Sequence, residues 1–358
     1  MSGGLVVLAS TVKDTLANVE RYVDGNLAGG ADHLVVFLDD PADPSTAPVR
    51  EFLDAHPHAT CVVADETWWT DKRPEQLNTR QRVNANVVKA LLSTVSWADW
   101  VFHVDADEIV QIPRAVLSSV PSSRAAVSLA PLEAVSRKHW EGDPTWFKRL
   151  LDEPDLVLLK TLGVIDRPAN GAYFHGHVEG KSGVRPTLDL WLTLHHVVDE
   201  EKDEVSAFTH PDLRLLHYES YSGEDFVRKW TSILAAGPKP AFRPGREPTA
   251  VALQTLISKG LTPEQAEPYL MRIFERTTED DFDALRDLGL LEHVDPLAGP
   301  HQPAALPDDS LATLLAAVRP EKKRPFHHGT SPDQVRKILD RVAASSSGGS
   351  GLRGFLKR

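Results

Sequence analysis

An apolar run leads directly into a cluster of acids in the segment Trp100-Val101-Phe102-His103-Val104-Asp105-Ala106-Asp107-Glu108. Its first five residues are mostly apolar and predict a buried strand, and three carboxylates follow where that strand ends. Because side chains two residues apart in an extended chain point to the same side, Asp105 and Asp107 can converge on one ion. Small Ala106 leaves room for a ligand. Glu108 is either a further ligand or an acid that supports the site or starts a helix.

Two carboxylates so close together repel, and an ion or an ordered set of hydrogen bonds must relieve that repulsion. Oxygen ligands with an open coordination shell suit Mg²⁺ or Mn²⁺, which often share the phosphates of a substrate. A divalent ion on a diphosphate neutralises the charge that builds on a leaving nucleoside diphosphate. An Asp-x-Asp pair is by itself a common solvated turn, and a phosphohydrolase or nucleotidyltransferase uses such a site too. The buried strand before it favours the metal site.

The residues before this stretch alternate apolar runs with amphipathic helices. Strands are predicted over 5–9, 33–38, 60–64 and 100–104, and helices over 16–27, 49–55 and 75–95. This alternation predicts an α/β fold with a mostly parallel sheet flanked by helices. Ligands bind beyond the carboxyl ends of the strands in such sheets. We therefore expect one edge of the sheet to gather Thr11, Asp14, Asp39, Asp40, Asp105 and Asp107.

The pattern changes twice in the remainder of the chain. Short strand-like runs over 126–129, 157–159, 190–198 and 213–217 suit the acceptor-facing half of an enzyme. Helical runs follow over 224–236, 249–259, 263–276, 280–288 and 310–318. We expect a main domain over 1–220, a helical C-terminal extension over 221–344 and a flexible tail over 345–358. The end of the tail is basic and apolar, which permits weak peripheral contact with a membrane, although a frayed terminus is the favoured explanation.

Composition excludes several classes of protein. With 358 residues, 41% hydrophobic and 25% charged, the chain is typical of globular proteins. A formal net charge of -12 argues against non-specific binding of nucleic acid, which needs a basic surface. The single cysteine, Cys61, excludes an internal disulfide and fits a reducing compartment. Since no segment has the length of a membrane span, we expect a cytoplasmic location.

Residues 98–108 resemble the Asp-x-Asp-Glu strand of bacterial glycosyltransferases related to families 2 and 92. Residues 11–14 and 18–22 resemble the opening motif of that group, with Thr15 in place of the usual Glu, and residues 33–40 are similar to its second strand. The resemblance covers residues 5–110 well and 170–232 more loosely. It implies a GT-A fold, a Rossmann-like sheet that binds a nucleotide sugar in its N-terminal half.

The resemblance also implies roles for individual residues. The loop of Ser10, Thr11 and Asp14 would hold the base and ribose together with Asp39 and Asp40. Asp105 would bridge the ribose and the metal, and Asp107 would coordinate the ion directly. A histidine late in the core of such enzymes often completes the metal shell, and His217 in Leu-His-Tyr-Glu-Ser-Tyr resembles it.

The helix over 75–95 gives an independent argument. Val83, Val87, Ala90 and Leu91 define its buried arc, and three polar residues lie in or beside that arc: Arg80, Gln81 and Asn84. Polar groups on a buried face need partners. A nucleotide or its diphosphate is one such partner, and structural hydrogen bonds to loop backbone are the other. The sequence favours neither.

The second half of the site is expected in the glycine-punctuated stretch 175–186, which is similar to a Lys…Arg-Pro segment of the same group. Lys181 or Arg185 would meet phosphate oxygens there, and an ordinary basic loop is the alternative. An inverting transfer also needs a general base. The Glu-Asp pair that usually supplies it is absent between Lys181 and His217, which leaves Glu179, Asp189 and His196 as candidates.

Together these patterns predict a non-processive, metal-dependent glycosyltransferase. It would move one sugar from a nucleoside-diphosphate sugar, preferably UDP-linked, to a hydroxyl of a glycan, lipid-linked or small-molecule acceptor, with inversion favoured over retention. A sugar-nucleotide nucleotidyltransferase is the first alternative, but Ser10-Thr11-Val12-Lys13 lacks its glycine-rich loop. A non-catalytic glycan- or partner-binding protein on the same scaffold is the second. The absence of the Glu-Asp pair supports this second alternative, whereas the paired acids Asp105 and Asp107 oppose it.

Overall fold

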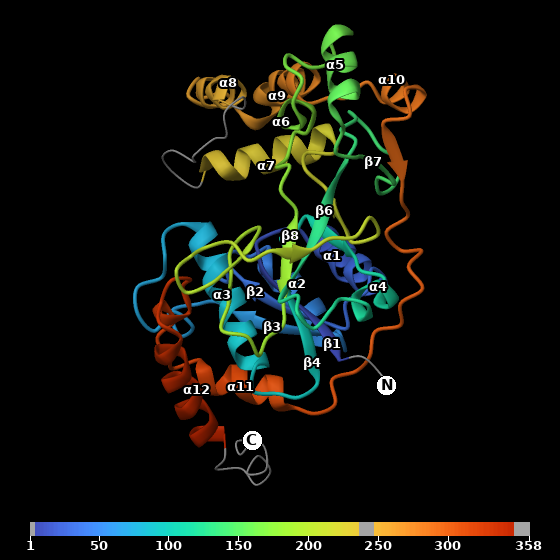
Figure 1. The fold of residues 1–358 in the computed structure, drawn as a ribbon. Coiled ribbons are helices and arrows are strands. Elements are labelled where there is room, and N and C mark those ends of the chain that lie inside the picture. The colour runs from blue at the N-terminus through green and yellow to red at the C-terminus, as the bar shows by residue number, and fades with distance from the viewer. Residues whose placement is uncertain (1–3, 236–246, 347–358) are drawn as a thin grey trace. The chain divides into compact units, whose positions relative to one another are not determined.

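The structure, a computed structural model, describes residues 4–235 and 247–346 (Figure 1). The chain forms two compact units. The first contains Met1–Ala130, Glu179–Leu215 and Pro296–Arg358, and the second contains Pro131–Val178 and Leu216–Asp295. These units divide the chain at other positions than the expected boundaries at 220 and 344. The reason is that the middle segment packs with the first C-terminal helices, whereas the chain beyond Pro296 returns to the first unit.

Four parallel strands form the centre of the first unit. They are β1 (Leu5–Val12), β2 (His33–Leu38), β3 (Ala59–Val63) and β4 (Ala98–His103), and they lie in the order β4-β1-β2-β3. The chain builds outward from β1 to β3 and then returns to place β4 on the other side of β1. Sheets of this kind bind ligands where the strand order reverses, here between β1 and β4. The predicted α/β fold with a mostly parallel sheet flanked by helices is confirmed.

Helices cover both faces of this sheet. One face packs against α1 (Leu16–Ala28) and α2 (Thr46–Ala55), and the other packs against α3 (Leu77–Leu92), α11 (Ser310–Val318) and α12 (Pro332–Ser346). Alternate strand residues divide between the two cores: Val6 and Leu8 belong to the first, Val7 and Ala9 to the second. α1 begins where the Thr15 hydroxyl accepts a hydrogen bond from the backbone N–H of Asn18.

Shorter elements extend the sheet beyond β4. β5 (Glu108–Gln111) follows the acidic cluster, α4 (Arg114–Ser118) comes next, and β8 (Lys181–Val184) pairs antiparallel with both β4 and β6 (Ala126–Ala134). β9 (Trp191–Leu192) and β10 (Val197–Val198) form a hairpin, and β11 (Ala207–Phe208) pairs with β6. Gly183 is required in β8, because a Cβ at this position would lie 2.3 Å from the ring of Phe102.

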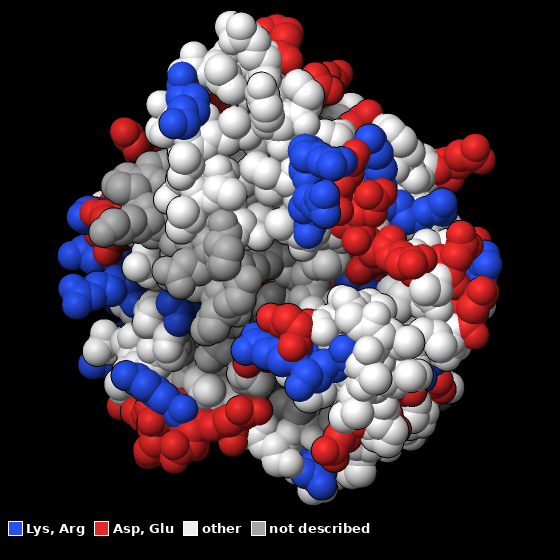
Figure 2. All heavy atoms as spheres, turned by 90° about the horizontal axis from the view of Figure 1, so that it is seen from above, with Lys and Arg blue, Asp and Glu red and all other residues white. Residues whose placement is uncertain are grey.

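The second unit is mainly helical, as expected for the C-terminal part of the chain. It contains β7 (Trp146–Lys148), α5 (Glu153–Thr161), α6 (Asn170–Tyr173), α7 (Gly223–Ala235), α8 (Glu247–Ile257), α9 (Pro263–Thr277), α10 (Phe282–Asp287) and β13 (Leu291–His293). β6 and β12 (Arg214–His217) contribute residues to both units. Charged side chains on the face shown in Figure 2 form groups of mixed sign.

The strand predicted over 157–159 is wrong, because these residues lie in α5. The side chain of Asp152 caps this helix by accepting a hydrogen bond from the Asp155 N–H, and a proline stands in its first turn. Leu156 and Leu159 are buried, whereas the two residues between them are exposed. Burial therefore follows the helical period, although four apolar residues in a row resemble a strand.

Two further regions differ from expectation. α12 was not predicted, although Val335, Ile338 and Val342 stand at helical spacing and are buried. The first two residues of the expected tail, Ser345 and Ser346, end this helix, and residues 347–358 lie outside the described part of the chain, so membrane contact through the tail stays a prediction. Within residues 4–235 and 247–346, no helix has the length and apolar character of a membrane span.

A buried ion network holds the second unit together. The ammonium of Lys148 lies 2.9 Å from Glu133 and 3.2 Å from Asp280, and Asp280 is 3.0 Å from the His175 ring. Burial works against the charge of Asp280, but Lys148 and His175 outweigh it and lower the pKa of this carboxyl to about 2.

This network makes the stability of the second unit depend on pH. Because the pKa of Asp280 is 3.8 without these contacts and about 2 in the folded chain, its contribution is present above 3.8 and is lost as the pH falls through 2. We expect about 2 kcal/mol from this group. Urea unfolding over this pH range should show a flatter dependence for Asp280→Asn than for the native chain. Parallel curves for the two proteins would contradict the assignment.

Candidate functional site

Carboxylates gather at the carboxyl edge of the sheet in the first unit. The Asp39 N–H donates to the Val12 carbonyl at 2.9 Å, and the Val104 N–H donates to the Ala9 carbonyl at 3.2 Å, so the chain segments that leave β1, β2 and β4 begin side by side. The acids follow at Asp14, Asp39, Asp40, Asp105 and Asp107. Ser10 and Thr11 lie within β1 and are buried, so the expectation that they form a loop was wrong.

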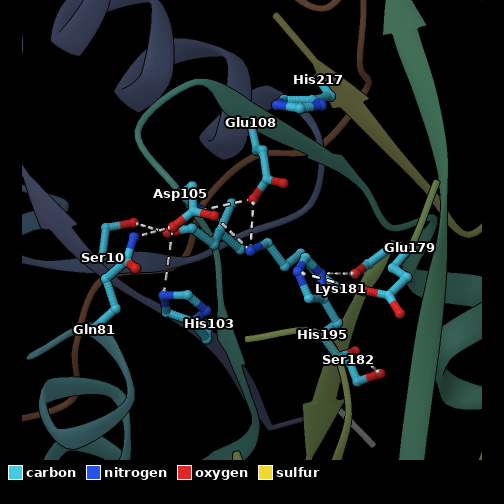
Figure 3. A network of polar contacts seen from close by, with 12 residues as sticks. Ser10, Gln81, His103, Asp105, Glu108, Glu179, Lys181, Ser182, His195 and His217 are labelled. Atoms are coloured by element: carbon cyan, nitrogen blue, oxygen red, sulfur yellow. Dashed lines mark hydrogen bonds and ion pairs between the residues drawn. The ribbon is translucent and has the colours of Figure 1, made fainter. Parts of the chain in front are cut away.

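Asp105 is the centre of a polar network (Figure 3). The Lys181 ammonium lies 2.6 Å from its Oδ2 atom, and the Gln81 side-chain amide donates a hydrogen bond to its Oδ1 atom. The backbone N–H of Asp105 donates to Glu108 Oε2 at 2.8 Å, which lies 3.5 Å from the Lys181 ammonium. Glu108 starts β5 rather than a helix, and its carboxylate fixes the turn that carries Asp105 and Asp107.

Burial and charge act against each other in this network. Lys181 and Glu108 are fully buried, whereas the Asp105 side chain keeps 23% of its surface exposed. Burial alone would lower the pKa of Lys181, but Asp105 and Glu108 outweigh it and raise that pKa. Burial, aided by Lys181, lowers the pKa of His103 to about 4, so its ring is neutral at pH 7. The Lys181 ammonium thus lies in the field of three carboxylates, those of Asp105, Asp107 and Glu108.

Lys181 and Arg185 occupy opposite ends of β4. In the antiparallel pairing, Gly183 lies opposite Phe102 and Val184 opposite Val101. Lys181 is therefore carried beyond the carboxyl end of β4, whereas Arg185 lies 2.8 Å from Asp99 and over the Trp100 ring. Four residues of strand separate the backbones of Lys181 and Arg185 by about 13 Å. Lys181 is a buried strand residue rather than part of a basic loop.

The acids that follow β2 have protein partners. The guanidinium of Arg80 binds both carboxylate oxygens of Asp39, at 2.7 and 2.6 Å, and Arg73 lies 3.2 Å from the same group. Asp40 is about half exposed and pairs with Lys13 at 2.8 Å. The Asp39–Arg80 pair is a bidentate, buried contact that fixes α3 to the end of β2.

Asn84 also has protein partners at both ends of its amide. Its oxygen accepts a hydrogen bond from the Trp68 indole at 3.0 Å, and its nitrogen donates to the Thr11 hydroxyl at 2.9 Å. Asp14 lies at the start of α1, where it accepts hydrogen bonds from Thr15 and Asn18. Arg80 also donates to the loop carbonyls of Pro74 and Glu75, at 2.9 and 2.7 Å, so the polar arc of α3 makes structural contacts both to side chains and to loop backbone.

Two of the three candidate bases lie together. The Glu179 carboxylate is 3.7 Å from the rings of both His195 and His196, and the other ring nitrogen of His196 is 3.1 Å from Glu204. Asp189 pairs instead with Arg336 of α12 and lines a cavity of about 200 Å³ with Lys89. The structure therefore separates Asp189 from Glu179 and His196.

His217 belongs to the second unit. Its ring stacks on that of His177 with centroids 4.7 Å apart, and it lies 3.9 Å from Glu219, which pairs with Lys229 at 2.8 Å. Sequence reasoning did not select His177 or Glu219, although the patterns His-Gly-His and Leu-His-Tyr-Glu contain them. That His217 is a metal ligand stays a prediction.

Comparison with known proteins gives weak structural similarity only. No protein-family model and no curated protein sequence matches the chain. Similar solved structures include the mannosyltransferase PcManGT from Pyrobaculum calidifontis in complex with GDP-Man and Mn²⁺ (TM-score 0.33, 14% identity, 98% of this chain and 89% of that one). HddC from Yersinia pseudotuberculosis has a TM-score of 0.30 and 9% identity over 63% and 97% of the two chains.

The bifunctional glycosyltransferase WbbM, in its apo form, has a TM-score of 0.24 and 12% identity over 52% of this chain and 32% of that one. Because these scores are low, we derive function from the side chains at the carboxyl edge of the sheet.

Proposed function

We propose that this protein is a non-processive glycosyltransferase. It moves a single sugar from a nucleoside-diphosphate sugar, with UDP as the favoured nucleotide, to an acceptor hydroxyl. The observation that carries the proposal is the position of Asp105 and Asp107 directly beyond β4, at the point where the strand order reverses. Phosphorylated ligands bind at this point in open α/β sheets.

The proposed donor site needs a divalent cation. Asp105 and Asp107 offer carboxylate oxygens, the ligands that Mg²⁺ and Mn²⁺ prefer, and the Asp105 side chain keeps 23% of its surface exposed. When bound, the ion supplies charge neutralisation for the leaving diphosphate.

The protein's own residues prepare the donor site. Glu108 accepts the Asp105 N–H and keeps the turn in place, and Gln81 holds one oxygen of Asp105 so that the other faces Lys181. In the proposed enzyme, Lys181 shares Asp105 with the cation and limits the repulsion between the carboxylates while no ligand is bound. Asp39 and Asp40 follow β2 and are proposed to border the base and ribose.

We assign the general base to the pair of Glu179 and His196. A base must accept the proton of the acceptor hydroxyl as the oxygen attacks the anomeric carbon. His196 lies between the carboxylates of Glu179 and Glu204, which would stabilise the imidazolium that forms after proton transfer. Inversion of the anomeric centre is the outcome we favour for such a direct attack.

The base assignment predicts a selective kinetic effect. His196→Ala and Glu179→Gln should lower kcat about 100-fold or more, while the affinity for UDP and Mn²⁺ stays unchanged. The readout is UDP release from a panel of UDP-sugars, with and without glycan acceptors. Asp189→Asn is the matched control and should keep its activity, because Asp189 pairs with Arg336 of α12 and not with Glu179 or His196. If Asp189→Asn loses activity and both other variants keep it, the assignment is wrong.

The same assay tests the function itself. We expect UDP release that depends on Mn²⁺ or Mg²⁺ and stops when a chelator is added. A protein that binds UDP and metal yet releases no UDP from any donor would contradict the assignment as an enzyme.

A further inference from the structure

A second cleft lies in the first unit, on another side of α3. It has a volume of about 600 Å³, which is within the usual range for small-molecule sites. Its walls come from the segment before α3, from α3 itself, and from η1 (Arg324–Phe326) with the residues that follow it. The Thr70 hydroxyl donates to the Glu321 carbonyl at 3.0 Å and so links the first of these segments to the chain that leads into η1.

The cleft is separate from the Asp105 cluster. Thr79 and Val83 line it, and because they are four residues apart they share one face of α3. Gln81, which contacts Asp105, is two residues from each and therefore points about 200° away around the helix. A ligand in this cleft would contact a different face of α3 from the one that faces Asp105.

The charge of the lining favours an anion. Four cations line the cleft, Lys72, Lys202, Lys323 and Arg324, against one carboxylate, Asp71. Lys72 pairs with Glu75, and the Lys323 ammonium donates to three backbone carbonyls at 2.6 to 3.0 Å. In the described part of the chain, neither Lys202 nor Arg324 has an ion-pair partner. These two cations are available to a ligand.

Buried polar atoms at the cleft also need a partner. Trp69 is only 3% exposed, and its indole N–H has no hydrogen-bond acceptor among the described residues. A buried donor without an acceptor is unfavourable, and a ligand oxygen that reaches it would relieve this cost. The Nδ1 atom of His328 is buried without a partner as well. Burial, together with His327, Arg82 and Lys202, lowers the pKa of His328 to about 4, consistent with positive potential at this place.

Gly329 brings Lys202 close to this wall. Its φ of 77° is in the left-handed region, and a Cβ at this position would lie 2.2 Å from Cε of Lys202. The glycine therefore lets the lysine side chain lie directly against the segment that follows η1.

We propose that this cleft binds a small organic anion, a ring compound that carries a phosphate or carboxylate group. The anionic group pairs with Lys202 and Arg324, and an oxygen of the ligand accepts the Trp69 indole N–H. The ring packs on the apolar part of the wall, which includes Val83 and Pro74. The proposal does not depend on the assignment of the donor site.

Nuclear magnetic resonance of the ¹⁵N-labelled chain tests this site. The chain has eight tryptophans, and Trp69→Phe identifies the indole N–H signal of Trp69. We expect phenyl phosphate or benzoate, in the millimolar range, to shift this signal, and phenol to leave it in place. A shift with phenyl phosphate alone assigns a phosphate ligand, and a shift with benzoate alone assigns a carboxylate ligand. If neither anion moves the signal, the proposal is wrong.

A double variant tests the two available cations. Lys202→Gln combined with Arg324→Gln should weaken binding of the effective probe at least about tenfold, because each lost contact is a charged hydrogen bond. Both side chains are exposed, so the fold should survive. Lys337→Gln, an exposed lysine on α12 outside the cleft, is the control and should bind normally. Equal affinity of the double variant and the native chain for the probe would overturn the proposal. The proposal would also be wrong if UDP and Mn²⁺ shifted the Trp69 signal of the native chain and the double variant abolished that shift.

Discussion

Asp107→Ala should abolish the Mn²⁺-dependent binding of UDP and leave the fold intact. Asp107 lies in the turn between β4 and β5 and is only half buried, so its removal leaves the core unchanged. Asp107 is one of the two proposed metal ligands. Its loss should have a larger effect than the loss of a residue that only hydrogen-bonds to a ligand, which typically costs 10–100-fold in metal affinity. We therefore expect at least about a 100-fold loss in calorimetric titrations with UDP and Mn²⁺.

Asp99→Ala is the matched control for this variant. Asp99 is an acid of β4, but it lies at the amino end of this strand, where it pairs with Arg185. It should bind UDP and Mn²⁺ like the native chain. If Asp107→Ala retains metal-dependent binding while its circular dichroism is native, Asp107 is not a metal ligand.

Lys181→Met should destabilise the protein and at the same time tighten Mn²⁺ binding. The substitution removes the fully buried ammonium that lies 2.6 Å from Asp105 and 3.5 Å from Glu108. Breaking a buried pair in this way typically costs about 3–5 kcal/mol. A divalent ion would replace the lost positive charge. The ion would bind more tightly, because it would no longer compete with the ammonium for Asp105. Thermal unfolding should therefore show a larger rise in Tm with Mn²⁺ for Lys181→Met than for the native protein.

Lys148→Met separates this effect from a general loss of stability. Lys148 is also fully buried and paired, but its partners are Glu133 and Asp280 in the second unit. Its variant should lose similar stability without the added response to Mn²⁺. Equal Mn²⁺ responses in the two variants would show that Lys181 does not share its carboxylates with an ion.

Local patterns predicted much of the first unit. The bounds of β2 agree at both ends with the predicted strand over 33–38, and α1 agrees to within one residue. β2 is an unbroken run of buried residues, whereas the buried residues of α1 recur at helical spacing. The acids beyond β4 were also predicted correctly, because the end of the apolar run marks the carboxyl end of the strand. Short apolar runs are less informative, and the helix α5 was mistaken for a strand on that account.

Long-range pairings account for the rest. Lys181 and Asp105 are 76 residues apart in the sequence, and Arg80 and Asp39 are 41 apart. The residues next to them in the sequence therefore do not predict these ion pairs. Lys181 is brought to Asp105 by the antiparallel register of β8 on β4, and the same register carries Arg185 away. A sequence pattern shows which residue types are present, but the register between paired strands determines which of their side chains come into contact.

Calorimetry with UDP and Mn²⁺, in the presence and absence of a chelator, tests the central claim most directly. If Asp105 and Asp107 form a metal-dependent donor site, UDP should bind with Mn²⁺ and lose most of its affinity when the chelator is added. Undiminished UDP binding with the chelator, or no UDP binding with Mn²⁺, would contradict a metal-dependent nucleotide-sugar site at the end of β4.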